Sequence, residues 1–144
     1  MANGETINKA HRTMMSITKK IRLAAKHNLH PHNITPLQFQ TLFLLDCERS
    51  LYVKELVTEL NIKPSAATLI VDRLSEQELV HRYHDKKDRR MVKVELAPKG
   101  RALVREVKGK HLEMLTNYFS ILAPKEQETL VDLLGKLEKN IPVA

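Results

Sequence analysis

The sequence is poor in residues on which several common classes of protein depend. Its single cysteine, Cys47, excludes an internal disulfide and is typical of a reducing compartment. Only four glycines are present, and they form no glycine-rich phosphate loop. The longest unbroken apolar run covers the four residues 42–45, which is far too short to span a membrane. Charges recur throughout 7–26, where a secretory signal would be apolar, so we expect a cytoplasmic protein with no membrane segment.

Catalytic motifs are missing as well. The sequence has no zincin helix, no nucleophile elbow and no paired carboxylates in an apolar setting, so we do not expect an enzyme. Positive charge, in contrast, is abundant: 24 Lys and Arg face 17 Asp and Glu, which gives a formal net charge of +7. A basic chain of 144 residues is expected to form one domain, or one core with an oligomerisation arm, and to bind a polyanion.

Apolar residues recur near the start of the chain with helical spacing. Within 5–27 they are three or four positions apart, which places them on one narrow stripe of a helix. The stripe consists of Ile7, Ala10, Met14, Ile17, Ile21 and Ala24. So narrow a stripe favours packing against another helix, and a second chain could supply that helix.

The following residues alternate between helix and strand patterns. The segment 27–33 should break the first helix, after which Thr35 is expected to cap a new helix that begins at Pro36 and ends near Glu48. This helix is expected to bury Leu37, Leu42, Phe43 and Leu45. From there we predict a short strand at 51–53, helices at 54–60 and 64–77, strands at 79–84 and 91–96, and further helices from Pro98 and after Pro124. The leucines of these last two helices, among them Leu112, Leu133, Leu134 and Leu137, are expected to point inward. Residues 85–90, between the last two strands, are all charged.

This order of elements is that of a winged helix-turn-helix. The predicted fold class is therefore mainly α, an α+β winged helix. The helix at 64–77 opens with the small and hydroxylated side chains of Ser65, Ala66 and Thr68. Such a helix fits the major groove of B-form DNA, because small side chains let its backbone approach the base edges.

The charged hairpin tip has a matching role. Lysine and arginine at such a tip can reach an adjacent minor groove, where a narrow A·T-rich stretch concentrates negative potential. Asp88 and Arg90 are two residues apart, so we expect the carboxylate to hold the arginine and to limit the entropy lost on insertion. If Asp88→Ala left DNA affinity unchanged, this pairing would have no role in binding.

Three segments carry a resemblance to a known family. They are Thr35-Pro36-Leu37-Gln38-Phe39, then Pro64-Ser65-Ala66-Ala67-Thr68 with Val71-Asp72-Arg73-Leu74, and last the run from Asp88 to Leu96 followed by Lys99-Gly100. With these segments the chain resembles the MarR family of bacterial transcription regulators over nearly its full length. The resemblance implies a homodimer, a recognition helix at 64–77, a minor-groove contact by Arg90, and repression that a ligand or metal relieves.

The resemblance also divides the chain into regions. It implies a winged helix-turn-helix DNA-binding region at 35–97 and a helical dimerisation region made of 1–34 and 98–144. We expect double-stranded DNA and a second copy of the chain as partners. The predicted DNA-binding residues are Lys54, Lys63, Pro64, Ser65, Ala66, Thr68, Arg73, Lys86, Lys87, Asp88, Arg89 and Arg90.

Three positions depart from the family pattern: Leu69, Glu78 and Ala97, which stands where relatives usually have a hydroxyl before the helix that follows the wing. Relatives often have a basic residue directly after the threonine of the recognition helix, whereas this chain has Leu69, so arginine readout of guanine from that position is not expected. Relatives usually have glycine where Glu78 stands, so the end of this helix lacks a glycine for left-handed backbone geometry.

The effector is less well defined by the sequence. By resemblance, a small lipophilic or aromatic ligand would bind between the dimerisation helices and the DNA-binding region, near Met14, Ile17, Phe39 and Phe43. A zinc-responsive regulator of the same fold is an alternative, with His27, His30, His32 and His111 as candidate ligands; otherwise no cofactor is expected. Cys47, at the end of an apolar helix, is expected to be buried and not to sense redox state.

Two further alternatives remain at this point. A winged helix can bind protein instead of nucleic acid, and a basic chain can coat nucleic acid without regard to sequence. The small side chains of the recognition helix and the basic tip favour sequence-specific DNA binding.

Overall fold

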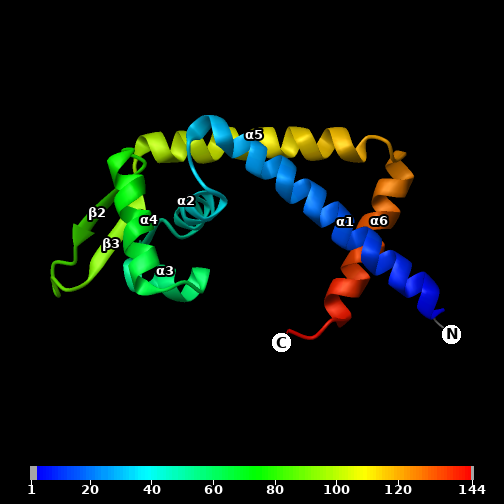
Figure 1. Cartoon of the computed structure of the whole chain (residues 1–144), viewed down its shortest axis with the longest axis horizontal. Coiled ribbons are helices and arrows are strands. Elements are labelled where there is room, and N and C mark those ends of the chain that lie inside the picture. The colour runs from blue at the N-terminus through cyan, green and yellow to red at the C-terminus, as the bar shows by residue number, and fades with distance from the viewer. Residues whose placement is uncertain (1–2, 144) are drawn as a thin grey trace. The chain divides into compact units, whose positions relative to one another are not determined.

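The computed structural model describes residues 3–143 and confirms the predicted α+β winged-helix class (Figure 1). Its elements, in chain order, are α1 (Gly4–Leu29), the 3-10 turn η1 (His30–His32), α2 (Pro36–Glu48), β1 (Ser50–Tyr52), α3 (Val53–Leu60), α4 (Pro64–Glu76), β2 (Val80–His84), β3 (Val92–Leu96), α5 (Pro98–Phe119) and α6 (Pro124–Asn140). The chain divides into two compact units, the first ending at Gly109 and the second beginning at Lys110. None of the described helices is long and apolar enough to cross a membrane.

The first helix ends within the segment 27–33 that was predicted to break it. Helix α1 continues to Leu29, and His30 N–H still donates to the carbonyl of His27. The first residue without an N–H is Pro31, so the helical hydrogen bonds persist until that point. The chain then turns at Asn33, whose φ of 54° lies in the left-handed region that asparagine tolerates.

The start of α2 is confirmed as predicted. Thr35 Oγ1 accepts a hydrogen bond from Gln38 N at 3.1 Å, and Gln38 Oε1 accepts one from Thr35 N at 3.0 Å. This reciprocal capping satisfies two backbone donors that a helix start otherwise leaves unpaired. Pro36 occupies the first turn, where its missing N–H costs nothing.

Strands β1, β3 and β2 form a three-stranded antiparallel sheet in that order. In the register, Leu51 of β1 lies opposite Val94 of β3, and Val94 lies opposite Arg82 of β2. Our sequence interpretation included the three strands but not the pairing of β1 with β3. That pairing fixes the start of α3 to the wing formed by β2, β3 and the residues between them.

The core of the winged lobe (residues 35–97) consists mainly of side chains from α2, α3, α4 and the sheet. Leu42, Leu45, Leu56, Leu74 and Val94 are each at most 1% exposed. The buried face of α4 is the one predicted, with Ala67, Ile70, Val71 and Leu74. Two expectations for this region were wrong, because Phe43 is 40% exposed and Cys47 is exposed. Both project from the side of α2 that turns away from this core.

The junction between α4 and α5 depends on two backbone features. Helix α4 ends with Leu79 N–H bonded to the carbonyl of Leu74 and Glu78 N–H bonded to that of Ser75. These two hydrogen bonds need left-handed backbone at Glu78, whose φ is 61°. The backbone geometry that usually requires glycine is therefore adopted here by a glutamate. Nearby, α5 passes so close to Leu79 that a Cβ on Gly100 would lie 2.0 Å from the Leu79 carbonyl oxygen.

Large apolar side chains remain exposed on the first and last helices. On α1, Ile7 is 54%, Met14 45% and Ile17 47% exposed, so the first part of the predicted stripe is exposed, whereas Ile21 and Ala24 are half-buried. On the last two helices we expected several leucines to point inward, but Leu112, Leu133, Leu134 and Leu137 are exposed.

Candidate nucleic-acid interface

The turn before α4 positions the start of the predicted recognition helix. Asn61 ends α3 in the left-handed region, with a φ of 50°, and Ile62 N–H closes the turn onto the carbonyl of Val57 at 3.1 Å. Lys63 takes the N-cap position of α4 and supplies no side-chain acceptor to the first turn. The backbone donors at this helix start can therefore meet an anion, which the helix dipole also favours.

The hydroxyls of α4 do not cap it. Thr68 Oγ1 donates to the carbonyl of Pro64 at 3.1 Å, one turn back along the same helix. Ser65, Thr68 and Leu69 are exposed, and Ala66 is half-buried. Ser65, Ala66 and Thr68 thus leave the outer face of the first turn small and accessible, as the major groove requires.

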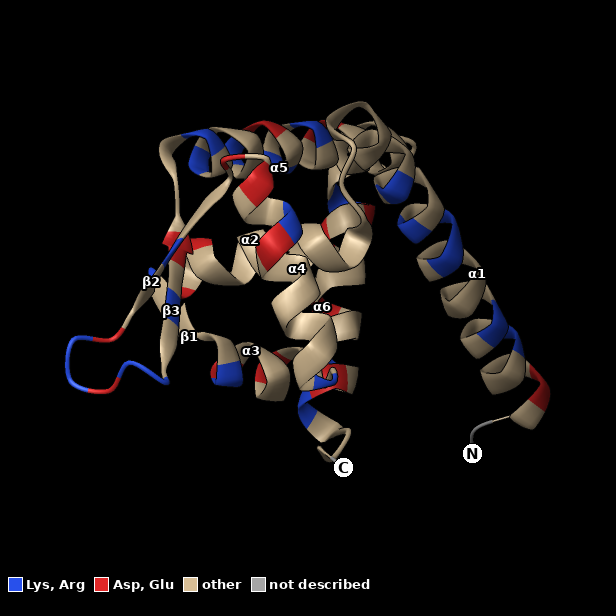
Figure 2. Ribbon diagram, turned by 60° about the vertical axis from the view of Figure 1, so that its left-hand side comes forward, with Lys and Arg blue, Asp and Glu red and all other residues tan. Residues whose placement is uncertain are grey.

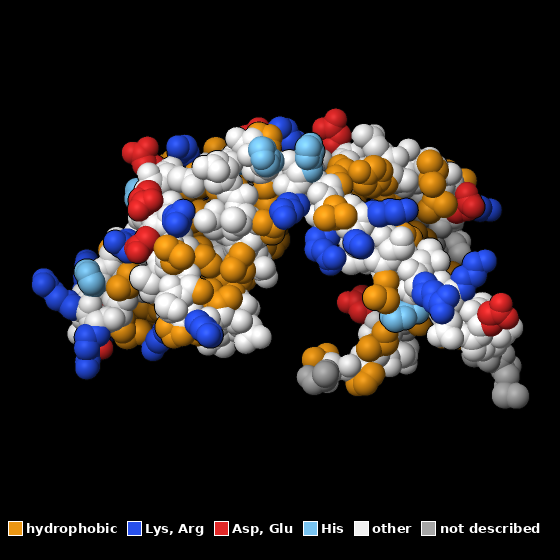
Figure 3. Space-filling model, viewed as in Figure 1, with side chains coloured by type: hydrophobic (Ala, Val, Ile, Leu, Met, Phe, Trp, Pro, Cys, Tyr) orange, Lys and Arg blue, Asp and Glu red, His pale blue; other side chains and the backbone are white. Residues whose placement is uncertain are grey.

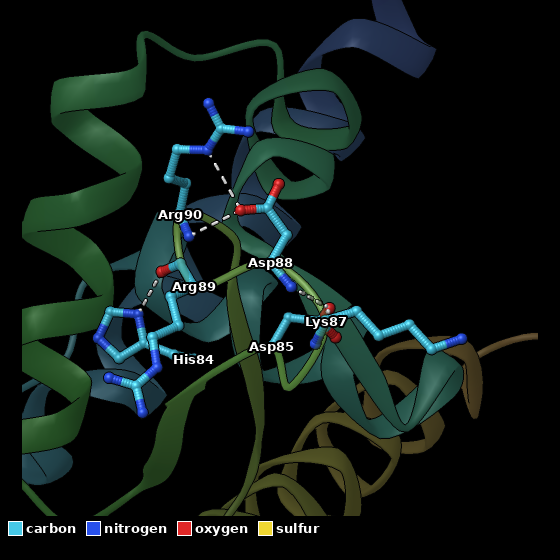
Figure 4. A network of polar contacts seen from close by, with 6 residues as sticks. All are labelled: His84, Asp85, Lys87, Asp88, Arg89 and Arg90. Atoms are coloured by element: carbon cyan, nitrogen blue, oxygen red, sulfur yellow. Dashed lines mark hydrogen bonds and ion pairs between the residues drawn. The ribbon is translucent and has the colours of Figure 1, made fainter.

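The wing tip is organised by a carboxylate that our sequence interpretation did not include among the binding residues. Asp85 Oδ2 accepts hydrogen bonds from the backbone N–H groups of Lys87 and Asp88, both at 3.2 Å (Figure 4). Its other oxygen, Oδ1, accepts one from the Tyr52 hydroxyl at 3.0 Å. Since Tyr52 belongs to β1, Asp85 ties the tip of the wing to the opposite edge of the sheet.

These contacts shift the ionisation of both partners. The hydrogen bond from Tyr52 lowers the pKa of Asp85 below its ordinary value; burial opposes this shift, and the two backbone hydrogen bonds reinforce it. The same hydrogen bond, together with burial and the charge of Asp85, raises the pKa of Tyr52. The tip is therefore built around a charged carboxylate.

The predicted contact between Asp88 and Arg90 is confirmed. Asp88 Oδ1 accepts from Arg90 Nε at 3.2 Å and from the Arg90 backbone N–H at 3.1 Å (Figure 4). Asp88 thus holds Arg90 at its backbone N–H and at Nε. The Arg90 side chain is nevertheless 91% exposed, so it projects into solvent. On the other side of the tip, His84 Nδ1 lies 2.7 Å from the Arg89 carbonyl oxygen, to which it donates as an N–H.

The remaining predicted cations are accessible. Lys54, Lys63, Arg73, Lys86, Lys87 and Arg89 are all exposed. Lys and Arg side chains gather at the wing tip in the space-filling view (Figure 3). Between α3, α4 and the wing lies an open, mainly apolar hollow of about 380 Å³, whose lining includes Val57, Pro64, Thr68 and Arg90.

Arg82 has a different role from these cations. It extends from β2 and forms an ion pair with Asp72 of α4, fixing the recognition helix to the wing. Our sequence interpretation missed Tyr52, Arg82 and Asp85, because their partners are distant in sequence or on another element. Only the position of Asp85, first in the charged run and next to a strand end, was a signal in the sequence.

Positive charge is unevenly distributed along the chain. The winged region 35–97 contains ten Lys and Arg and ten Asp and Glu, so its formal charge is zero. Helix α1 contains six Lys and Arg and one Glu, which gives +5 of the total of +7 (Figure 2). The net charge that suggested a polyanionic partner therefore does not come from the winged region.

Among residues 3–143 there is no group of three or more His, Cys, Asp or Glu side chains that could hold a metal ion. His27 lies in α1, His30 and His32 lie in the turn that follows, and His111 lies in the second unit of the chain. The Nε2 atom of His32 is buried without a hydrogen-bond partner in the described part of the chain. The structure of one chain thus gives no support to the zinc alternative.

The candidate effector residues lie on two helices. Phe39 and Phe43 of α2 pack with ring centroids 6.5 Å apart, and Lys108 Nζ lies 5.1 Å from the Phe43 ring centroid. Lys108 also contacts Asp46, with 3.6 Å between Nζ and Oδ2. On α1, Met14 lines a shallow hollow with side chains of its own helix, and Ile17 is 47% exposed.

Comparisons with known proteins agree with this geometry. A family model described as "MarR family" matches residues 34–92. The HTH-type transcriptional repressor MdtR of Bacillus subtilis is 30% identical over 125 residues, which are 87% of this chain and 81% of that protein. A MarR family protein from Bacillus stearothermophilus has a similar structure, with a TM-score of 0.84, 27% identity, and coverage of 96% of this chain and 97% of that one. A mutant MarR from E. coli complexed with operator DNA is similar with a TM-score of 0.68, 25% identity, and coverage of 95% and 99%.

Proposed function

This chain belongs to the MarR family of transcription regulators, and from that premise we propose that it is a homodimeric repressor that binds a pseudo-palindromic DNA operator and is released by a small-molecule effector. The observation that carries the proposal is the pairing of an uncapped, small-residue helix start on α4 with a wing whose Arg90 is oriented by Asp88. Helix α4 enters a major groove, and the wing reaches the adjacent minor groove.

The proposal of a dimer rests on the exposed apolar side chains of the terminal helices. Met14 and Ile17 of α1 and Leu134 and Leu137 of α6 are 42–51% exposed in a single chain. Exposed apolar side chains that share one face of a helix mark an interaction site, and a second copy offers the same faces. A two-fold dimer then requires half-sites about one helical turn apart.

Release by an effector follows from the same arrangement. A ligand that binds between the dimerisation helices and the winged lobe, near Phe39 and Phe43, changes the spacing between the two recognition helices. The ligand shifts the equilibrium between the DNA-binding spacing and the changed spacing only as far as its affinities for these two states differ. The rings of Phe39 and Phe43, which lie against each other, would supply apolar contacts to a small aromatic or lipophilic molecule.

The direct test is selection of bound fragments from the source genome, followed by gel-shift titration of the selected site against bulk DNA. We expect a pseudo-palindromic sequence and an affinity that falls with salt, by roughly 0.9 in log K per log salt unit for each neutralised phosphate. A protein-binding winged helix would select no DNA, and a coating protein would bind bulk DNA as tightly as any fragment. Either result would refute the proposal.

Arg90→Ala tests the wing. It should weaken binding to the selected site by about 1–3 kcal/mol, because one specific groove contact is lost. Arg105→Ala is the matched control, since it removes the same charge from an exposed position on α5, outside the winged region. Asp88→Ala should produce part of the Arg90→Ala loss by releasing the arginine. Equal affinities for wild type and Arg90→Ala would contradict the wing assignment.

A further inference from the structure

Leu69 is a large apolar side chain at the centre of the surface that faces outward from α4. It is 54% exposed and lies one turn after Ser65, on the side of the helix opposite the buried residues Ala67, Ile70 and Val71. It contributes nothing to the core of the winged lobe. The fold therefore does not explain a leucine at this position.

The neighbours of Leu69 on this face are polar or already engaged. Ser65, one turn earlier, offers a small hydroxyl, and Asp72, three residues later, is held by Arg82 in an ion pair. Arg73, one turn later, is exposed and lies toward the far end of the helix. When α4 enters a groove, Leu69 is the side chain of this face that can make apolar contact with a base edge.

We propose that Leu69 reads the C5-methyl group of thymine in the major groove. This inference rests on the proposed function, because it assumes that α4 enters that groove. Among the features of the four base pairs in the major groove, the thymine methyl is the apolar one, and the others are hydrogen-bond donors and acceptors. Leucine has no donor or acceptor, so it gains contact at thymine and leaves polar groups desolvated and unpaired at the other bases.

The experiment replaces each thymine of the selected operator by uracil, one position of the half-site at a time. Each replacement is made first in one half-site and then in both half-sites of the same operator. Uracil keeps the base pairing and removes only the methyl group. For the wild-type protein, one or two adjacent positions per half-site should be sensitive to the substitution. Binding should weaken about fourfold when one half-site is changed and about fifteenfold when both are, because each half-site loses the contact of one buried methyl group. Thymines outside the half-sites serve as control positions.

The Leu69→Ala variant completes a double-mutant cycle. It should bind the thymine and uracil operators equally at the sensitive position, with an unchanged thermal unfolding midpoint because Leu69 lies outside the core. Leu69→Arg should transfer the preference at that position to guanine, which an arginine reads through two hydrogen bonds.

The outcomes separate this inference from the proposed function. If no thymine of either half-site is sensitive to loss of its methyl, or if Leu69→Ala keeps the sensitivity, Leu69 does not read thymine, while operator binding by wild type leaves the proposed function intact. If the wild type selects no operator at all, both the proposed function and the reading by Leu69 are wrong.

Discussion

The winged lobe and the two terminal helices of this chain differ in how their apolar side chains are covered. In the lobe, Leu42, Leu45, Leu56 and Leu74 are at most 1% exposed, whereas α6 buries no residue and α1 buries only Leu29, at its last position. The lobe is electrically balanced and α1 carries +5. Leu29 of α1 and Val104 and Val107 of α5 join the core of the lobe, whereas the large apolar side chains that stay exposed on α1 and α6 can pack against another surface.

The largest expected effect comes from breaking that stripe. Ile17→Gln should raise the dissociation constant of the dimer roughly 100-fold, about 3 kcal/mol, because two copies of the side chain leave the interface and two amides enter it. Sedimentation over a range of concentrations measures the change. Lys19→Gln is the control on the opposite face of α1 and should leave the dimer intact. If Ile17→Gln also leaves it intact, the stripe does not form the dimer.

The next effect tests the closed packing of the lobe. Gly100→Ala should lower the free energy of unfolding by about 2–3 kcal/mol, because the new Cβ would overlap the Leu79 carbonyl oxygen, 2.0 Å away. Chemical denaturation measures it. Gly109→Ala, in the same helix, meets no atom within 4 Å and should be neutral or slightly stabilising. Equal behaviour of the two variants would contradict the close approach of α5 to Leu79.

A smaller and opposite effect is expected at the end of α4. Glu78→Gly should raise the free energy of unfolding by about 1 kcal/mol, because glycine adopts the φ of 61° without the steric cost that a Cβ imposes. Gln77→Gly, at the adjacent residue with a φ of −84°, should instead be destabilising. A loss of stability in Glu78→Gly would show that the side chain makes a contact worth more than the backbone cost.

The smallest effect concerns pH. The ordering of the wing tip by ionised Asp85 is present at neutral pH and is lost as the pH falls through its lowered pKa. Tyr52→Phe removes the main cause of that lowering, so the pKa of Asp85 should rise toward its ordinary value and the loss should begin at higher pH. Carboxyl NMR titration measures this shift. Tyr83→Phe is the control, since Tyr83 does not contribute to the lowered pKa of Asp85, and equal titrations in both variants would contradict the Tyr52 contact.

Much of the fold could be predicted because its signals are local. Thr35 with Gln38 forms the predicted cap, Pro64 starts α4, and the spacing of Ala67, Ile70, Val71 and Leu74 gives the correct buried face. The contact between Asp88 and Arg90 could also be predicted from the sequence, because side chains two residues apart on a tight turn lie close together. The end of α1 falls within the predicted break at 27–33, but the exact residue was not predicted, since composition does not show which residue first loses its hydrogen bond.

Burial outside the lobe was predicted less well. Phe43 and Cys47 lie in an apolar helix, but the sequence pattern does not show which side of α2 the sheet covers. The wing contacts from Tyr52 to Asp85 and from Arg82 to Asp72 join residues that are 33 and 10 positions apart. No local spacing predicts such contacts.

The sequence by itself determined the order of the elements, the caps, the inner face of the recognition helix and the basic tip of the wing, because each depends on neighbours within about one turn. Only the tertiary structure decided that β1 pairs with β3, that Asp85 receives the Tyr52 hydroxyl, and that Glu78 takes a left-handed backbone. These features depend on segments that meet only after the chain has folded, where packing outweighs the preference of any single residue.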